Sequence, residues 1–416
     1  MKNIVLSKEG CLKVKRRINR LHEKDCLDLA KNYLPGEWVI LVNAKEKLNY
    51  LGLINLRAEK NCPIIHLLNL NIQDFNAYLN TEEVEIATKY INDYISLAID
   101  KRSFYRNMGD NLRLIYGESD YLPGLIVDKY EKYILLQINT AGIDRFRDVV
   151  LNSLKTKFPN DKIVIHDDEN ERKLEGLPKL TTENEQTIYS EQKEKVDKVK
   201  LIENGLHLEI SADKIQKIGY YYDHRLNRHR FENLIINTNK TYNLGLDLFS
   251  YVGSWGLHLL RAKVNFVRFI DQGDFKQDIE NNIILNNFAN NRGEFIRSSV
   301  FDYLDQQLEE NALYDVIVSD PPAFAKSAKN KERALSGYSK LHEKILKILN
   351  KNSLMAICSC TNSVSFEELD ATVSEASRKA SRHVNLIDIG LAGFDHPIAS
   401  LQDRSNYLKY LAYYVE

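Results

Sequence analysis

The sequence has few cysteines and no long hydrophobic run. Its five cysteines are odd in number and scattered over 416 residues, which favours a reducing compartment over a disulfide framework. No apolar stretch reaches the roughly 18 residues that a membrane span needs. The first residues lack a signal-peptide pattern, so we expect a cytoplasmic protein without a membrane partner. Cys358 and Cys360 are spaced C-x-C without a second Cys/His pair, which predicts no metal site.

Charge is nearly balanced overall but not locally. The net charge of −1 gives no general indication of a nucleic-acid partner. Residues 1–60, however, hold 13 Lys and Arg against seven Asp and Glu, with a dense cluster around Lys15, Arg16 and Arg17. Residues 211–230 hold five basic residues against two acidic ones. Most basic clusters are solvated faces, but two in a neutral chain indicate a local surface able to contact phosphates.

Hydrophobic periodicity divides the chain into three parts. Residues 1–70 hold short alternating segments separated by Pro and Gly, which predicts a small β-barrel. Residues 71–200 begin with helical spacing and continue with strands, which predicts a central α/β domain. Within it, residues 181–200 are polar and form a linker or hairpin extension. Residues 201–416 change to repeated strand–helix alternation, which is typical of a parallel sheet.

Seven strands are expected in the third part, the last two joined without a crossover helix. This is the layout of a class I, Rossmann-like methyltransferase sheet. The expected strands are Tyr242–Phe249, Phe266–Ile270, Glu294–Ile296, Tyr314–Ser319, Leu354–Ser359, Val384–Ile389 and Tyr407–Tyr414.

Two of these strands end in chemically active residues. Asp320-Pro321-Pro322 follows one apolar run, and Cys358-Ser359-Cys360 follows the next. In an open α/β sheet, loops at the carboxyl ends of the strands line the ligand crevice. An acid, two rigid prolines and a thiol at one crevice suggest chemistry on a planar heterocycle.

A glycine-containing loop after the first of the seven strands suggests a cofactor site. It runs from Asp247 through Phe249 and Tyr251 to Gly253, and it opens a helix. Asp271 follows at the end of the second strand, where a carboxylate can accept hydrogen bonds from a ribose diol. The glycine spacing is not G-x-G-x-x-G, which disfavours an NAD-dependent oxidoreductase and favours S-adenosylmethionine.

Taken together, the motifs identify a resemblance over nearly the full length. They are Tyr116-Gly117-Glu118-Ser119-Asp120, Leu122-Pro123-Gly124, Arg172-Lys173, Glu175-Gly176, Gln216 to Arg225, Phe249 to Gly253, Asp320-Pro321-Pro322, Gly337-Tyr338, Ser359-Cys360 and Asp395-His396-Pro397. The chain resembles the bacterial 23S ribosomal RNA large-subunit cytosine-C5 methyltransferases that carry an amino-terminal PUA domain.

The resemblance implies a fold, a donor and an acceptor. The fold is a PUA-like β-barrel, a central α/β domain and a methyltransferase domain. S-adenosylmethionine is the implied donor, and a cytosine in 23S ribosomal RNA, naked or in a large-subunit assembly intermediate, is the implied acceptor. Self-association as a homodimer is left open.

The resemblance also assigns roles to residues. Cys360 takes the position of the nucleophile and Asp320 that of the acid before the paired prolines. The implied cofactor contacts are Gln216, Tyr221, Arg225, Asp247, Phe249, Tyr251, Gly253, Asp271, Ser299 and Asp320. The implied RNA contacts are Lys15, Arg16, Arg17, Phe324 and Tyr338.

Three positions depart from the family pattern. Ile218 stands where a hydroxyl residue is usual, and Ser299 where an acid near the adenine is usual. The His-Pro-Trp element usual after the first basic pair is absent after Arg16-Arg17. These departures bear on cofactor affinity and on RNA contacts of the barrel.

Two other functions compete with this interpretation. One is a methyltransferase for a ribosomal RNA amine or another base, without a covalent step. Ala323 after the prolines argues against it, because such sites usually place a stacking aromatic there. The other is an inactive, ribosome-associated RNA-binding protein, which Ile218 and Ser299 favour.

Overall fold

A computed structural model shows the protein as two compact units. The first contains Met1–Val199, Ile215–Tyr220 and Asp395–Ala399; the second contains Lys200–Lys214, Tyr221–Phe394 and Ser400–Glu416. The structure describes residues 1–16, 18–27, 29–43, 48–60, 62–68, 82–105, 111–178, 188–189, 195–214, 219–325, 328–398 and 406–416. In these ranges, no helix has both the length and the apolar character to span a membrane.

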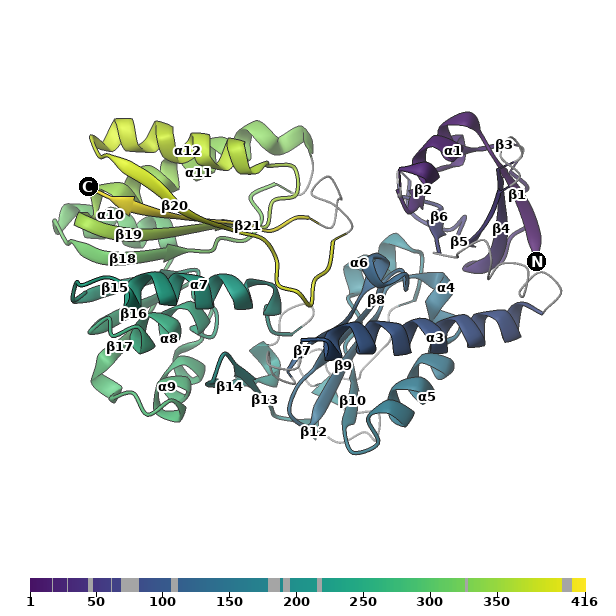
Figure 1. Cartoon of the computed structure of the whole chain (residues 1–416), viewed down its shortest axis with the longest axis horizontal. Coiled ribbons are helices and arrows are strands. Elements are labelled where there is room, and N and C mark those ends of the chain that lie inside the picture. The colour runs from purple at the N-terminus through teal and green to yellow at the C-terminus, as the bar shows by residue number, and fades with distance from the viewer. Residues whose placement is uncertain are drawn as a thin grey trace. The chain divides into compact units, whose positions relative to one another are not determined.

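The first unit begins with a six-stranded mixed sheet in the order β2-β6-β5-β4-β1-β3 (Figure 1). Its strands are β1 (Lys2–Leu6), β2 (Arg20–Leu21), β3 (Cys26–Leu27), β4 (Glu37–Asn43), β5 (Leu48–Ile54) and β6 (Ile65–Leu67). Helix α1 (Lys8–Lys15), which the alternation pattern did not predict, begins where the Ser7 hydroxyl accepts a hydrogen bond from the Gly10 N–H at 3.1 Å. The pairings within the described ranges leave the sheet open between β2 and β3, so a closed PUA barrel stays a prediction.

A helix and a second sheet follow in the same unit. Helix α3 (Glu83–Ser103) lies in the segment for which the sequence predicts helical spacing. That segment begins at residue 71, and residues 71–81 lie outside the described ranges. The sheet has the order β10-β9-β8-β7, with only the β9–β10 pair parallel. Its elements are β7 (Leu112–Tyr116), η3 (Gly117–Asp120), β8 (Leu125–Lys129), β9 (Tyr133–Ile138), α4 (Ala141–Asp144), α5 (Arg147–Lys157), β10 (Lys162–Ile165) and α6 (Glu169–Leu174). The segment 181–200 is described only in part, as the pair β11 (Ile188–Tyr189) and β12 (Lys195–Val196) and the start of β13.

The motif Asp395-His396-Pro397 folds with this first unit rather than with the strands that flank it in sequence. The Arg113 N–H donates to the Asp395 carboxylate at 3.2 Å, and the Arg113 guanidinium lies 3.0 Å from His396 Nε2. The same guanidinium forms a two-bond ion pair with the buried Asp128. A chain segment between the last two strands of the second unit therefore completes a buried polar cluster in the first.

The second unit is built on a seven-stranded sheet in the order β17-β16-β15-β18-β19-β21-β20 (Figure 1). Its strands are β15 (Leu244–Leu248), β16 (Phe266–Asp271), β17 (Gly293–Arg297), β18 (Tyr314–Ser319), β19 (Leu349–Ser359), β20 (Val384–Gly390) and β21 (Lys409–Val415). Strand β21 runs antiparallel to both neighbours, and the pairs formed by β15 to β19 are parallel. Seven strands at nearly the expected positions, with β20 and β21 antiparallel, agree with the sequence pattern.

Helices cover both faces of this sheet. Figure 1 shows α11 and α12 on one face and α7, α8 and α9 on the other. Their bounds are α7 (Arg225–Ile236), α8 (Ser254–Arg261), α9 (Lys276–Leu285), α10 (Val300–Glu309), α11 (Lys331–Lys347) and α12 (Phe366–Ala380). A hairpin of β13 (Lys198–Glu203) and β14 (Leu206–Ser211) precedes them and contacts α9, where Asn282 accepts from the Glu209 N–H at 2.7 Å.

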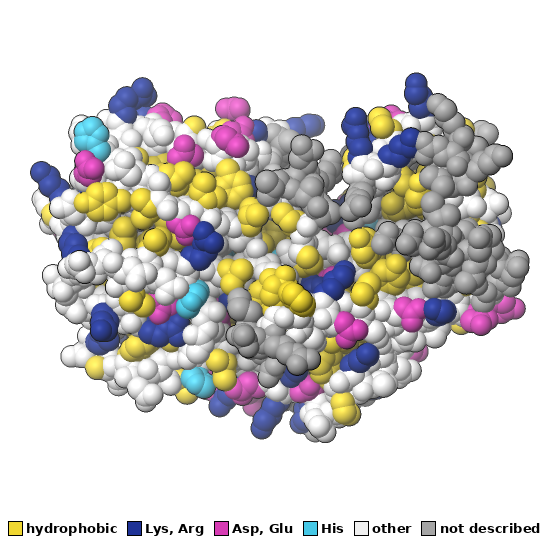
Figure 2. All heavy atoms as spheres, viewed as in Figure 1, with side chains coloured by type: hydrophobic (Ala, Val, Ile, Leu, Met, Phe, Trp, Pro, Cys, Tyr) yellow, Lys and Arg dark blue, Asp and Glu magenta, His cyan; other side chains and the backbone are white. Residues whose placement is uncertain are grey.

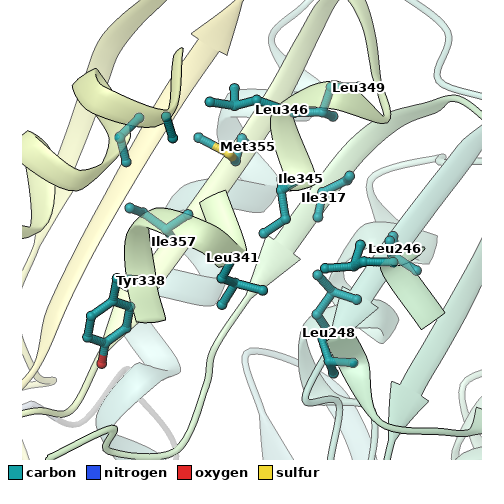
Figure 3. Close-up of a cluster of buried hydrophobic side chains, with 14 of the residues drawn as sticks. Leu246, Leu248, Ile317, Tyr338, Leu341, Ile345, Leu346, Leu349, Met355 and Ile357 are labelled. Carbon is teal, nitrogen blue, oxygen red and sulfur yellow. The ribbon is translucent and has the colours of Figure 1, made fainter. Parts of the chain in front are cut away.

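A cluster of buried hydrophobic side chains lies between the sheet and α11 (Figure 3). Side chains from β15, β18 and β19 point there toward one face of α11. The labelled members are Leu246, Leu248, Ile317, Tyr338, Leu341, Ile345, Leu346, Leu349, Met355 and Ile357. All six residues of β18 are buried, because helices cover both faces of the sheet, and this explains its apolar centre, Val316 to Val318. Packing on both faces fixes where the carboxyl ends of these strands lie.

Candidate active site

Four predicted site residues lie at the carboxyl ends of neighbouring parallel strands. Asp271 ends β16, Asp247 stands one residue before the end of β15, and Asp320 and Cys360 directly follow β18 and β19. The parallel registers of these four strands bring the four side chains to one edge of the sheet. The predicted crevice is therefore made by residues that are far apart in sequence.

The loop after β15 is held in an unusual backbone conformation. Phe249 and Tyr251 have positive φ angles of 62° and 48°, which residues with a side chain rarely adopt. Gly253 has φ 86° and caps the start of α8. Such local strain persists only where surrounding contacts enforce it, and it concentrates at functional sites. Gly256 has a packing role instead, since a Cβ there would lie 2.1 Å from the Phe269 ring.

Two acids fix this loop. Asp247 accepts a hydrogen bond from the Gly256 N–H at 2.8 Å through one carboxylate oxygen. Asp271 accepts from the Tyr251 N–H at 3.0 Å and from the Gly273 N–H at 2.9 Å. Because backbone donors hold these carboxylates, their orientation is set before any ligand arrives.

The loop leaves buried acceptors that a ligand can satisfy. Asp247 Oδ1, the Ser250 hydroxyl and the Ser319 hydroxyl are buried without a hydrogen-bond partner among the described residues. Burial raises the pKa of Asp247 well above its usual range, so a donor or a positive charge beside it would be strongly stabilising. The residues present therefore fit a ligand with hydroxyl and ammonium donors, as S-adenosylmethionine has.

Tyr221 lies beside the same loop. Its ring makes an edge contact with the ring of Tyr251, with centroids 5.4 Å apart, and the residue is 39% exposed. Partial burial and nearby acids, Asp320 and Asp271 among them, raise the pKa of Tyr221 to about 12. This places a neutral phenol at the predicted cofactor site.

The remaining predicted cofactor residues are Arg225, Ser299 and Gln216, and the structure describes the first two. Arg225 is fully buried in α7, with its guanidinium over the Tyr222 ring and 3.9 Å from Glu203, so its visible contacts are structural. Ser299 precedes α10 as its cap, without a hydrogen bond from its side chain to the helix. Gln216 lies outside the described residues, as does Ile218.

Asp320 is held by a histidine and a tryptophan. The Trp255 indole N–H donates to one of its oxygens at 3.1 Å, and His224 Nε2 lies 3.3 Å from the other. Burial alone would raise the pKa of Asp320, but the charge and hydrogen bonding of His224, together with the Trp255 bond, lower it below its usual value. Asp320 is therefore a carboxylate at neutral pH.

The two thiols differ in access. Cys358 is fully buried with its sulfur 3.9 Å from His224 Nδ1, and burial raises the pKa of Cys358 well above its usual range. Cys360 is partly exposed, and its sulfur lies 3.8 Å from the carbonyl oxygen of Pro321. Since only a thiolate is a strong nucleophile, the structure favours Cys360 as the reactive member of the pair.

Phe324 and Tyr338 form one stack beside Cys360. Their ring centroids are 4.6 Å apart with an interplanar angle of 27°. Tyr338 is fully buried, and its hydroxyl bonds the hydroxyls of Ser359 and Thr361, each at 2.8 Å. Thr361 also accepts from the Phe324 N–H at 3.2 Å. Tyr338 thus supports Phe324, which is the partly exposed member of the stack.

Comparison with known proteins places the chain in a family. A Methanocaldococcus jannaschii protein named as a ribosomal RNA large subunit methyltransferase is 31% identical over 350 residues, which cover 82% of this chain and 85% of that protein. The chain belongs to the ribosomal RNA large subunit methyltransferase family. Ribosomal RNA large subunit methyltransferase I of Aliivibrio fischeri strain ES114 is 29% identical over 298 residues, 71% of this chain and 72% of the relative. No protein-family model matches.

Solved structures agree on the fold. A SAM-dependent methyltransferase structure from Streptococcus mutans aligns over 100% of both chains with a TM-score of 0.77 at 17% identity. A second methyltransferase structure, complexed with SAH, has the same TM-score, identity and coverage. At the level of the family, the prediction of a ribosomal RNA methyltransferase that uses S-adenosylmethionine is confirmed.

Sequence reasoning did not assign roles to three residues of this methyltransferase that lie at the site. His224 and Trp255 contact Asp320, and Lys409 at the start of β21 lies opposite Ser359. His224 stood inside a motif already singled out, which was a usable signal. Trp255 directly follows the loop, whereas nothing in the sequence around Lys409 indicates that β21 pairs beside Cys360.

The two predicted basic clusters have different outcomes. In the second cluster, Arg225 and Arg228 are buried, so they do not form a phosphate-contacting surface. Arg228 instead makes a two-bond ion pair with Glu203 at 2.6 and 2.8 Å. The prediction of a binding surface at residues 211–230 is therefore wrong for these two arginines, whereas Arg230 is exposed and pairs with Asp388.

In the first cluster, two charges are already neutralised. Lys13 pairs with the buried Asp25 at 2.7 Å, and Arg20 pairs with Glu118 at 2.7 Å. Lys15 and Arg16 are exposed, and Arg17 lies outside the described residues. Figure 2 shows several Lys and Arg side chains close together on the surface of the N-terminal domain. The cluster thus retains exposed positive charge at the end of α1.

Proposed function

We propose that this protein forms 5-methylcytosine in 23S ribosomal RNA, using S-adenosylmethionine and a covalent bond between Cys360 and the target base. The observation that carries the proposal is the accessible thiol of Cys360 beside the Asp320-Pro321-Pro322 loop. The family membership supports the RNA class, and the loop of β15 supports the donor.

The chemistry explains why a thiol is needed. C5 of cytosine is a poor nucleophile because the ring is aromatic. Addition of the Cys360 thiolate to C6 breaks the aromaticity and makes C5 nucleophilic. Bound S-adenosylmethionine supplies the methyl group that C5 then takes up. A base removes the C5 proton, the C5–C6 double bond re-forms, and the sulfur–C6 bond breaks to return the thiolate.

Asp320 acts on the opposite edge of the base. Because His224 and Trp255 keep it ionised, it accepts a hydrogen bond from the exocyclic amine instead of donating one to N3. This contact holds the base so that its C6 faces the Cys360 sulfur. The rigid prolines that follow fix the backbone on which the acid stands.

The target base has to leave its stack to reach these groups. Phe324, supported by Tyr338, offers a ring face for the extruded base. The N-terminal domain acts as a PUA-like RNA-binding module, with Lys15 and Arg16 contacting phosphates. With ribosomal RNA as its substrate, the protein acts in the cytoplasm.

The experiment that tests the function is nucleoside analysis. Purified protein is incubated with isotope-labelled S-adenosylmethionine and either naked 23S ribosomal RNA or large-subunit assembly intermediates, and the digested nucleosides are separated by mass spectrometry. Label in 5-methylcytidine supports the proposal. Label in N4-methylcytidine would instead support the amine methyltransferase, and an absence of label on both substrates would support an inactive RNA-binding protein.

We expect Asp271→Ala to weaken S-adenosylmethionine binding by about 1–3 kcal/mol, the cost of leaving buried hydroxyls unpaired. The loss has two sources, since Asp271 also holds the Tyr251 backbone. Calorimetric titration of the isolated protein measures it. Asp302→Ala, which removes an exposed carboxylate in the first turn of α10, is the matched control and should leave the dissociation constant unchanged. An Asp271→Ala protein that binds as tightly as wild type would refute the pocket assignment.

Neutralising Lys15 and Arg16 together should flatten the salt dependence of RNA binding, by up to about one slope unit per lost phosphate contact. Affinity for the methyl donor should not change. Fluorescence anisotropy across a salt series provides the slope. Lys89→Gln combined with Lys276→Gln removes two similarly exposed charges elsewhere and should preserve it. An unaltered slope in the Lys15 and Arg16 variant would make those residues a solvated face.

A further inference from the structure

Lys409 is a buried lysine without an ion-pair partner among the described residues. It is 3% exposed and begins β21, directly opposite Ser359 in the antiparallel pair with β19. Its ammonium donates to two backbone carbonyls, of Thr361 at 3.0 Å and of Tyr407 at 2.9 Å. Lysines are almost never fully buried unless a negative charge compensates them.

The two carbonyls show where the ammonium points. Ser359 and Thr361 flank Cys360 in the chain, so the nitrogen lies beside the backbone that carries the thiol. An ammonium has three donors, and the two carbonyls use two of them. A neutral thiol gives the remaining charge no compensation, whereas a thiolate at Cys360 does.

We propose that Lys409 is a positioning residue that supplies the counter-charge for a resident Cys360 thiolate. This inference rests on the proposed role of Cys360 as nucleophile, and it adds the means by which the thiol ionises. The established family membership assigns no role to this lysine.

The other titratable groups around Cys360 and Lys409 do not supply a counter-charge for the thiolate. Tyr221, Tyr338 and Cys358 are neutral near pH 7, since burial raises the pKa of each. Asp320 is anionic and opposes thiol ionisation, and His224, 3.3 Å from Asp320, pairs with that carboxylate. Glu368 also acts on Lys409, but it forms an ion pair with Lys331. Among these groups, Lys409 is the one that favours a thiolate.

The charge of Lys409 is present in the pH range that matters. Burial lowers the pKa of Lys409 to about 8, while the thiolate of Cys360 and the carboxylate of Glu368 act to raise it. Below about pH 8 the ammonium is protonated and stabilises the thiolate. Above that pH it loses its charge, so its contribution fades.

The test is the pH dependence of Cys360 alkylation in the full-length protein. Iodoacetamide labelling is followed over pH 5–10, and the Cys360 peptide is quantified by mass spectrometry. Wild-type Cys360 should react with a midpoint clearly below the ordinary thiol value of about 8.5. Lys409→Met should move that midpoint upward and reduce labelling at pH 7 about tenfold, and Lys409→Arg should stay within about threefold of wild type.

A matched control is available in Lys240. It also donates to two backbone carbonyls, of Asn352 and Lys351, but it is exposed. Lys240→Met should leave Cys360 labelling unchanged. An ordinary midpoint in the wild-type protein would overturn the proposal without any variant, and so would an unchanged profile in a folded Lys409→Met protein. Labelling is measured without RNA, so a failure of the methyl-transfer assay alone refutes the proposed function and not this inference.

Discussion

Cys360→Ser should abolish methyl transfer, with a loss of about 10⁴-fold or more, the scale seen when a covalent nucleophile is removed. A serine hydroxyl is scarcely ionised near neutral pH, whereas a thiol beside a lysine ammonium is ionised in part. The side chains are nearly the same size, so the fold and the methyl-donor site should be preserved. Incorporation of labelled methyl groups into ribosomal RNA measures the loss.

Cys358→Ser is the internal control for this variant. Cys358 is fully buried two residues earlier, and its sulfur contacts His224. The protein should therefore remain largely active, with a reduced melting temperature as the main effect. If Cys360→Ser kept wild-type activity, the covalent mechanism would be wrong and the amine methyltransferase would become the better account.

Asp320→Asn should reduce the turnover number about 10²-fold, the scale of misplacing a reacting group. The amide keeps the shape of the side chain and an acceptor for Trp255, but it loses the charge that His224 holds in place. Single-turnover rates with saturating donor and RNA measure the chemical step.

Trp255→Phe serves as the comparison for Asp320→Asn. It removes the indole N–H that donates to Asp320 and leaves the carboxylate in place, so the rate should fall less than tenfold. Because the pKa of Asp320 is lowered, this acid stays ionised over the working pH range. The acid limb of the wild-type pH–rate profile should therefore follow the ionisation of the Cys360 thiol and not that of Asp320. A turnover number unchanged in Asp320→Asn would remove this acid from the mechanism.

The parts of the fold that the sequence predicted well are those whose burial follows simple periodicity. Strand β18 was placed at both ends because all six of its residues are buried. Helix α12 begins at an equally local signal, a capping box formed by Ser365 and Glu368.

Helix α7 was missed for a physical reason. Its buried face mixes Phe231 and Ile235 with Arg225, Arg228 and Glu232, which make ion pairs and a ring contact. A hydrophobicity pattern cannot detect such a face. The same cause produced the wrong interpretation of Arg225 and Arg228 as members of a surface cluster, because basic residues in a sequence show no sign of their buried partners.

The sequence predicted the site residues only where it also predicted the ends of the strands that carry them. Asp247, Asp271, Asp320 and Cys360 each stand at or next to the carboxyl end of a predicted strand, so their convergence followed from the parallel order. Lys409 reaches the site from the antiparallel strand β21, whose pairing register with β19 decides which residue lies beside Cys360. A shift by one residue would place Tyr410 there, and sequence periodicity does not fix a register to that accuracy.

The most direct measurement of the central claim is a trapping experiment with RNA that carries 5-fluorocytosine at the target position. After methyl transfer, such a base has no C5 proton to lose, so the sulfur–C6 bond cannot break. Wild-type protein should form an RNA adduct that survives denaturation, requires S-adenosylmethionine and maps by peptide sequencing to Cys360. Cys360→Ser should form none. An adduct on Cys358 would exchange the two thiols, and no adduct from an active wild-type protein would contradict covalent catalysis.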